Sequence, residues 1–217
     1  MNSTNTSLPI TPFPTAGSPP PPFMPDNHPE LFPYVLLSMV IIAFQCFIIP
    51  FAYTVRVRSK VFTKDFMQQF WEEHHKAFPE DTLEAFEKSI GFPDMGSGVF
   101  AKKLSYADWY KFSNAQRVHY NYLENLQLIL VLIFIAGLKQ PLAALILACI
   151  YFAGRTIYSF GYGMSGPNGR GIGGAFAGLA LITLFALSLY TVSEYMKLYH
   201  MHAPQAGGPN HMSKHGL

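Results

Sequence analysis

Residues 34–55 read YVLLSMVIIAFQCFIIPFAYTV and contain no Asp, Glu, Lys or Arg. A helix needs about 20 mostly apolar residues to cross the hydrocarbon core of a bilayer, so this stretch predicts a membrane-spanning helix. The whole chain has the same bias, since 50% of its 217 residues are apolar and 13% are charged, against roughly 25% charged in soluble domains. The composition predicts an integral membrane protein and excludes a soluble enzyme and a transcription factor.

Three more apolar stretches predict three further spanning helices, at residues 112–138, 141–163 and 172–197. Short connections between the last three helices make them antiparallel neighbours. The predicted fold is therefore all-α: an integral membrane four-helix bundle over residues 34–197.

Three segments flank or interrupt this membrane domain. Residues 1–33 hold ten of the 17 prolines and no Lys or Arg, a composition that predicts a disordered tail. Residues 198–217 are predicted to be a flexible His-rich tail. Residues 56–111 form a long loop, and ten of the 15 Lys and Arg residues lie between Arg56 and Arg117. The positive-inside rule therefore predicts a cytosolic loop, with both termini across the membrane.

Apolar residues recur on one helical face in the first part of this loop. They are Phe62, Phe66, Met67, Phe70, Trp71 and Phe78. The pattern predicts an amphipathic helix, which either lies on the membrane surface or caps the cytosolic mouth of the bundle.

Cysteine and charge usage exclude other classes of protein. Cys46 and Cys149 both lie inside apolar runs, which argues against a disulfide scaffold. The two cysteines are far apart in the sequence, so the chain has no Cys-x-x-Cys motif. The net charge of +2 is weak, and no basic cluster has aromatic residues interleaved, so no nucleic acid partner is predicted. No metal site is predicted either, because the Glu72–His75 run is more typical of a solvated helix face.

The second predicted helix carries polar residues at membrane depth, where they mark a functional site by default. Arg117, Asn121 and Glu124 are spaced i, i+4, i+7, which places them on one face. A guanidinium, an amide and a carboxylate together suit a zwitterionic ligand. An internal ion pair between Arg117 and Glu124 explains the pattern equally well.

The third helix ends with Arg155, Tyr158 and Tyr162, and Arg170 follows after a Gly- and Pro-containing turn. The two phenols suit hydrogen bonding to a ligand, and they are also typical of an interfacial tyrosine belt. A cation at Arg170 lowers the pKa of a nearby thiol, or it serves only as a positive-inside residue. Small-residue spacing at the start of the fourth helix predicts close helix packing through Gly171, Gly174 and Gly178.

These residues resemble two motifs of the MAPEG family, the membrane-associated proteins in eicosanoid and glutathione metabolism. Arg117-Val-His119-Tyr-Asn121-Tyr-Leu-Glu124 is similar to its Arg-x-His-x-Asn-x-x-Glu signature, and the Arg155–Tyr162 segment with Arg170 is similar to its second motif. Within the family, the spacings are most similar to those of the microsomal glutathione S-transferase 3 subgroup. The resemblance covers roughly residues 34–197.

The resemblance implies a homotrimer of four-helix subunits, with glutathione as co-substrate bound between neighbours on the cytosolic side. It implies that Arg170 stabilises the glutathione thiolate. It also implies a set of glutathione-binding residues: Arg117, His119, Asn121, Glu124, Tyr158 and Tyr162. His119 lies about 200° around the helix from Arg117, so it cannot line the same pocket within one subunit. The resemblance implies that it reaches the ligand of the adjacent subunit instead. Either Arg56 or Arg58 is expected to do the same.

The resemblance leaves three functions open. The first is a glutathione transferase or peroxidase that acts on lipophilic electrophiles or lipid hydroperoxides drawn from the membrane lipids. The second is a non-catalytic accessory subunit of a larger membrane complex, which the long loop and the tails favour. The third is an eicosanoid synthase that forms leukotriene C4 or prostaglandin E. The leukotriene branch has Tyr directly after the signature Glu, whereas this chain has Asn125. The expected location is the endoplasmic reticulum membrane, with a mitochondrial membrane as the alternative.

Overall fold

The computed structural model describes residues 27–89 and 94–202, and all regular structure within these ranges is helical. The prediction of an all-helical chain is confirmed for this part of the protein. Most of the predicted N-terminal tail, residues 1–26, lies outside the described residues. So do residues 203–217, with His211 and His215 of the predicted His-rich tail.

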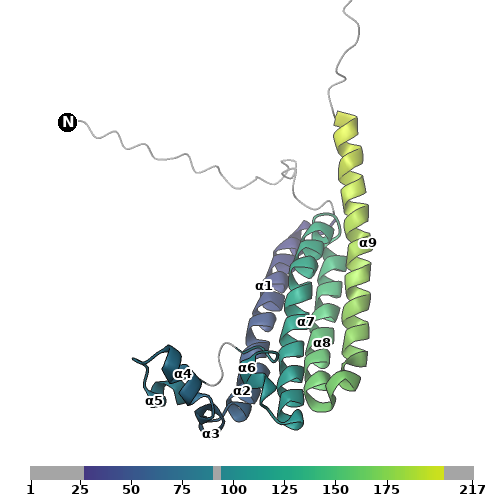
Figure 1. Ribbon diagram of the computed structural model, residues 1–217. Helices are drawn as coiled ribbons and strands as arrows, with labels where there is room; N and C mark the ends of the chain where they lie inside the picture. The colour runs from purple at the N-terminus through teal and green to yellow at the C-terminus, as the bar shows by residue number, and fades with distance from the viewer. Residues whose placement is uncertain (1–26, 90–93, 203–217) are drawn as a thin grey trace, which may run out of the picture.

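Four long helices lie side by side (Figure 1). They are α1 (Phe32–Ile49), α7 (Tyr106–Gly137), α8 (Pro141–Ser165) and α9 (Gly171–His202). The short 3-10 helix η1 (Pro29–Leu31) precedes α1. The α7 helix starts six residues before the predicted boundary, because Ser105 caps it: the Ser105 hydroxyl accepts a 3.1 Å hydrogen bond from the Asp108 backbone N–H, as preferred N-cap residues do.

Three continuous helical segments in the described part of the chain are long and apolar enough to cross a membrane: Pro29–Val61, Tyr106–Gly137 and Pro141–Met201. The first continues from α1 through the π-helix η2 (Pro50–Thr54) into α2 (Val55–Val61). The third contains α8, the 3-10 helix η3 (Gly166–Arg170) and α9, and the chain reverses direction at η3 (Figure 1). These spans agree with the predicted membrane protein, while four separate crossings stay a prediction.

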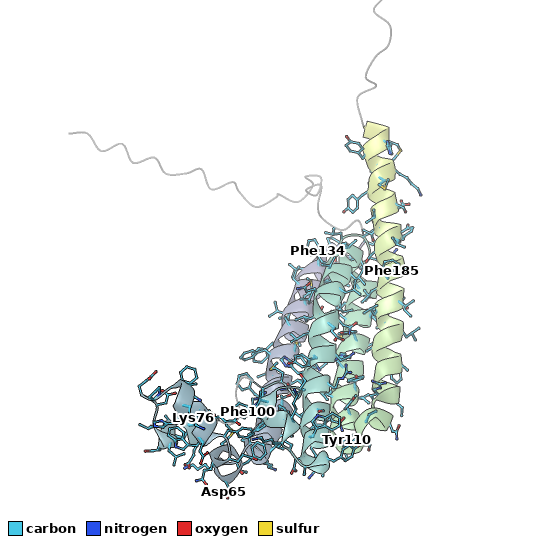
Figure 2. The ribbon with its side chains drawn as sticks, in the orientation of Figure 1. Asp65, Lys76, Phe100, Tyr110, Phe134 and Phe185 are labelled. Carbon is cyan, nitrogen blue, oxygen red and sulfur yellow. The ribbon has the colours of Figure 1, made fainter. Side chains whose placement is uncertain are left out.

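The long helices pack around one apolar core and expose apolar residues on their outer faces. Ile42, Tyr122, Ile133 and Leu184 are fully buried between the helices. By contrast, half or more of the surface of each of several large apolar side chains is exposed on α1 and α9, among them Val40, Phe44, Ile182 and Phe185. Phe185 points away from the other helices (Figure 2). Lipid tails are as apolar as these side chains, so the pattern suits a bilayer.

Close approach of α8 to η3 and to α9 depends on glycines other than the predicted ones. A Cβ atom on Gly161 or Gly169 would collide with the backbone of the other residue, and Gly154 and Gly173 form a similar pair. Within one chain, Gly171, Gly174 and Gly178 do not make the predicted close helix packing. A Cβ atom on Gly171 or Gly178 would meet nothing within 4 Å, and one on Gly174 would reach only the Tyr158 ring.

Residues 62–89 and 94–105 form several short helices instead of the single amphipathic helix that the apolar pattern predicts. They are α3 (Lys64–Gln68), α4 (Trp71–Ala77), α5 (Leu83–Glu87) and α6 (Val99–Lys102). The side chains of Thr63 and Thr82 cap α3 and α5 by accepting backbone N–H groups, which divides the segment into separate turns.

The apolar face of this segment is largely used in a core of its own. Phe62, Met67 and Phe70 are buried, and they pack with Phe112 of α7. Phe78, however, is half exposed. The short helices lie at one end of the long helices, and α4 and α5 project to the side of the bundle (Figure 1). Capping the bundle and lying on the membrane surface both stay open.

Candidate functional site

Several of the predicted site residues line one cavity between α7, α8 and α9, which we call the α8–α9 cavity. It has a volume of about 410 Å³. Its polar lining consists of Asn121, Asn125, Tyr151, Arg155, Tyr158 and Arg170. Gly171, Gly174 and Gly178 complete the α9 wall, together with Ala177 and Leu181. The predicted glycine stripe therefore opens a space beside α9, because side chains are missing there.

Arg155 is the central polar group of this cavity. Its side chain is 3% exposed, and its Nη1 donates a 2.8 Å hydrogen bond to Oδ1 of Asn121. The guanidinium carbon lies 4.4 Å from the ring centre of Tyr122 and 4.6 Å from that of Tyr158. Stacking on two aromatic rings holds the planar guanidinium in one orientation.

A second cavity holds the other two members of the predicted α7 face, and we call it the α7 cavity. It has a volume of about 680 Å³ and is lined by Arg117, Glu124 and Tyr162 among others. Tyr110 also lines it and marks the end of α7 at which the short helices gather (Figure 2). Within one chain, Asn121 thus faces a different cavity from Arg117 and Glu124. The structure gives no ion pair between Arg117 and Glu124 in the part of the chain that it describes.

Tyr158, Tyr162 and Arg170 connect the two cavities. Both tyrosines are 5% exposed, and their ring centres are 5.7 Å apart. Tyr158 lines the α8–α9 cavity, while Tyr162 lines the α7 cavity. The Arg170 guanidinium lies 5.8 Å from the Tyr162 ring centre, and Arg170 also lines the α8–α9 cavity. The predicted cation and the two phenols are therefore neighbours.

Backbone geometry fixes Arg170 at this place. The contact between Gly161 and Gly169 brings η3 directly against the end of α8. Gly166 begins the turn with a φ of +63°, a region that residues with a Cβ atom adopt at a steric cost. Arg170 follows as the last residue of η3, and α9 starts after it.

His119 lies apart from both cavities. Its side chain is half-buried, and its ring stacks beside that of Tyr120 at 6.1 Å. It lines neither of the two cavities. The helical spacing predicts that His119 does not share the pocket of Arg117, and its position agrees with this. Its expected contact with a neighbouring subunit stays a prediction.

The two arginines near the end of α1 have different surroundings. Arg58 is buried, and its Nη2 donates a hydrogen bond to the backbone carbonyl of Asp94. Its guanidinium also lies 4.9 Å from the Phe112 ring centre. Arg56, one half-turn earlier on α2, is exposed. Arg58 therefore joins α2 to the loop at residues 94–98, and Arg56 faces outward.

The loop at residues 94–98 forms part of the α7 cavity. Met95, Gly96 and Ser97 contribute to its lining. The Asp94 carboxylate holds the loop by accepting backbone hydrogen bonds from Gly96, Gly98 and Ala101 at 2.7–3.1 Å. The Trp109 indole N–H donates to the Gly96 carbonyl at 3.1 Å. A segment outside the two sequence motifs thus closes one side of the cavity.

The set of site residues predicted from the sequence misses three groups that the structure brings in. Tyr151 and Asn125 join the α8–α9 cavity, Arg155 is its most buried charge, and residues 95–97 join the α7 cavity. A signal for Arg155 was present, because it is a lone charge within an apolar helix. The loop has no comparable sequence signal.

Metal-binding groups do not gather in the described parts of the chain. Residues 27–89 and 94–202 contain no cluster of three or more His, Cys, Asp or Glu side chains suited to a metal ion. His74 of the Glu72–His75 run instead forms a 2.8 Å hydrogen bond with Asp81.

A family model matches most of the chain. The model of the MAPEG family matches residues 31–190, a range that contains α1, α7, α8, both cavities and most of α9. No curated protein matches the chain significantly. Since the match covers well over half of the sequence, the chain belongs to the MAPEG family.

Proposed function

We propose that this protein is a membrane-bound glutathione transferase and glutathione-dependent peroxidase, of the microsomal glutathione S-transferase 3 type, that acts on lipophilic substrates. The MAPEG family includes glutathione transferases, peroxidases and eicosanoid synthases. The observation that carries this choice is the position of Arg170 in the α8–α9 cavity, beside Tyr158 and Tyr162. A fixed cation at a cavity that also holds phenol donors suits a thiolate.

The two cavities carry the chemical groups that glutathione requires. Glutathione has two carboxylates, one ammonium group and one thiol. The guanidinium groups of Arg117, Arg155 and Arg170 complement the anionic groups, and the Glu124 carboxylate complements the ammonium. Asn121 and the two tyrosines add neutral hydrogen-bonding groups.

In the proposed reaction, Arg170 favours ionisation of the bound thiol, whose proton leaves to water. The thiolate then forms a carbon–sulfur bond with an electrophilic carbon, and the leaving group departs with the electrons of its old bond. With a lipid hydroperoxide, two glutathione molecules become one disulfide while the hydroperoxide is reduced to an alcohol and water. The protein supplies charge stabilisation and positioning, and no covalent intermediate forms on it.

We further propose a homotrimer with four crossings per subunit in the endoplasmic reticulum membrane. In this assembly, His119 and the exposed Arg56 reach the glutathione of the adjacent subunit. The buried position of Arg58 supports the choice of Arg56, because Arg58 is already held by Asp94.

Turnover tests this proposal directly. Purified trimer is given glutathione and either an electrophilic aromatic compound or a lipid hydroperoxide, and product is measured for wild type and Arg170→Ala. We expect turnover that depends on glutathione, with kcat/KM about a hundredfold lower in the variant. Absence of turnover with every substrate would reject the proposal.

An accessory role is favoured by one separate observation. Phe70, Phe78, Phe86 and Phe100 line a groove of about 550 Å³ on the short helices, which borders the α7 cavity at Met95 and Ser97. Aromatic grooves of this kind occur at protein interfaces. Extraction in mild detergent separates the roles: migration with a larger complex favours the accessory subunit, and migration as a free trimer argues against it.

A further inference from the structure

The Arg155 guanidinium has hydrogen-bonding capacity that the protein leaves unused. Its Nη1 is taken by Asn121, whereas Nε and Nη2 are buried and have no hydrogen-bond partner among the described residues. These two nitrogens form one edge of the planar guanidinium. Their two parallel N–H groups match the two oxygens of a carboxylate.

The surroundings of Arg155 do not neutralise its charge. Asn121 offers a neutral oxygen, and Tyr122 and Tyr158 offer only their ring faces. Arg170 adds a second cation to the same cavity, and no carboxylate of the described residues lines it. A charge within a membrane helix is costly unless it is paired. A counter-charge from a ligand meets this requirement.

Tyr151 provides an independent observation at the same place. It lies one helical turn before Arg155 on α8, on the same face, and it lines the same cavity. Its side chain is 1% exposed, and its hydroxyl has no hydrogen-bond partner in the described parts of the chain. Buried hydroxyl groups are almost always paired, so this orphan donor also indicates a missing acceptor.

We propose that Arg155 and Tyr151 together bind a carboxylate of the ligand at the inner end of the α8–α9 cavity, and thereby select acidic ligands. Arg155 binds both oxygens through Nε and Nη2, and the Tyr151 hydroxyl donates a third hydrogen bond. The inference rests on the proposed function in one respect: the carboxylate comes from glutathione or from an acidic lipophilic co-substrate such as a fatty acid.

Titration calorimetry on the full-length protein in lipid nanodiscs tests this site. Four probes are compared: glutathione, its diethyl ester, a long-chain fatty acid and the methyl ester of that acid. Each is titrated into wild type, Arg155→Gln, Tyr151→Phe and the control Lys64→Gln. Lys64 is an exposed cation on α3 and lines neither cavity, so its variant controls for loss of one positive charge.

We expect the probe whose free carboxylate enters the site to bind about ten- to a hundredfold more weakly to Arg155→Gln, because a charge-assisted pair is lost. For Tyr151→Phe, the expected loss is about two- to tenfold. The matching ester binds weakly to every variant, and the control behaves as wild type. If the variants bind glutathione more weakly, the bound carboxylate comes from glutathione. If they bind the fatty acid more weakly, it comes from the lipid.

Unliganded stability separates this role from a purely structural one. Tyr151→Phe removes an unpaired buried hydroxyl, so its thermal midpoint without ligand should equal or exceed that of wild type. This variant also decides the test if Arg155→Gln fails to fold. The proposal would be overturned if Tyr151→Phe bound both glutathione and the fatty acid with wild-type affinity. Esters that bind wild type as tightly as the acids would also overturn it.

Failure of the proposed function gives a different result. If glutathione does not bind to wild type while fatty acid affinity still depends on Arg155 and Tyr151, the carboxylate site stands and the glutathione chemistry falls. If glutathione binds and reacts at wild-type rates in both variants, and the fatty acid also binds both variants with wild-type affinity, the carboxylate site falls and the chemistry stands.

Discussion

Arg155 of α8 and Asn121 of α7 are joined by a 2.8 Å hydrogen bond from Nη1 to Oδ1. The bond joins a residue of the first MAPEG-like motif to a residue of the second. It gives a buried cation a neutral partner and leaves its other edge free. Apart from the two rings on which it stacks, Arg155 therefore has Asn121 as its hydrogen-bond partner in the described part of the chain. We propose that a ligand carboxylate binds its other edge.

Substitution of Asn121 should separate stability from binding. Asn121→Leu removes the acceptor of a buried charged donor and should lower the free energy of unfolding by about 1–3 kcal/mol. Asn121→Asp supplies an internal counter-charge, so it should raise the thermal midpoint but weaken glutathione binding at least tenfold. Thermal unfolding and titration of the same samples measure both. A lower midpoint for Asn121→Asp than for Asn121→Leu would contradict this account.

The glycine contacts between α8 and α9 give a matched pair of variants on one helix. A Cβ atom on Gly173 would collide with the backbone of Tyr158, whereas one on Gly178 would meet nothing within 4 Å. Gly173→Ala should therefore destabilise the protein by several kcal/mol, within the range of large core effects, about 4–5 kcal/mol. Gly178→Ala should stabilise the unliganded protein by up to about 1 kcal/mol, because Ala favours a helix. Equal thermal midpoints for the two variants would refute the packing described.

A polar chain between α1, α7 and α8 should also contribute to stability. The Tyr122 hydroxyl donates to Oε1 of Gln45 at 2.5 Å, and Nε2 of Gln45 donates to Oγ1 of Thr156 at 2.7 Å. Gln45→Leu should cost about 1–3 kcal/mol, because the buried Tyr122 hydroxyl loses one of its two acceptors and the half-buried Thr156 hydroxyl loses a donor. In a Tyr122→Phe background the cost should be smaller, since the two residues are coupled. Additive losses in thermal unfolding would show that the chain is not cooperative.

The loop at residues 94–98 should affect ligand binding through its shape. Asp94→Ala removes the acceptor of three backbone hydrogen bonds, at about 1 kcal/mol or more for each. Hydrogen exchange at Gly96, Gly98 and Ala101 should accelerate, and glutathione affinity should fall because the loop lines the α7 cavity. Asp65 is exposed on α3, so Asp65→Ala is the control. Unchanged exchange at all three amides would count against this account.

The sequence predicts the helices well because length and apolar composition determine a membrane helix. Residues 34–55 correspond to α1, η2 and the start of α2, and the α8 boundaries agree closely. The division of residues 62–89 and 94–105 into short helices was not predicted. It depends on Thr63 and Thr82 as caps and on the distant Phe112 as a packing partner, and helical periodicity contains no information about such contacts.

The candidate site could be predicted only in part for a similar reason. Spacing identifies residues on one helix face, but it does not show how neighbouring helices divide that face between cavities. Asn121 and Arg117 therefore separate in the structure although they share a predicted face. Arg56 and Arg58 could not be distinguished from the sequence, because the burial of Arg58 depends on Asp94, 36 residues away.

The central claim is that Arg170 holds a glutathione thiolate. Purified protein is mixed with glutathione near neutral pH, and the ultraviolet absorbance of the thiolate is followed for wild type and Arg170→Ala. Our account predicts one thiolate per bound glutathione in wild type, and bound glutathione without thiolate in Arg170→Ala. Glutathione that binds wild type only as the neutral thiol, or thiolate that persists in Arg170→Ala, would contradict it.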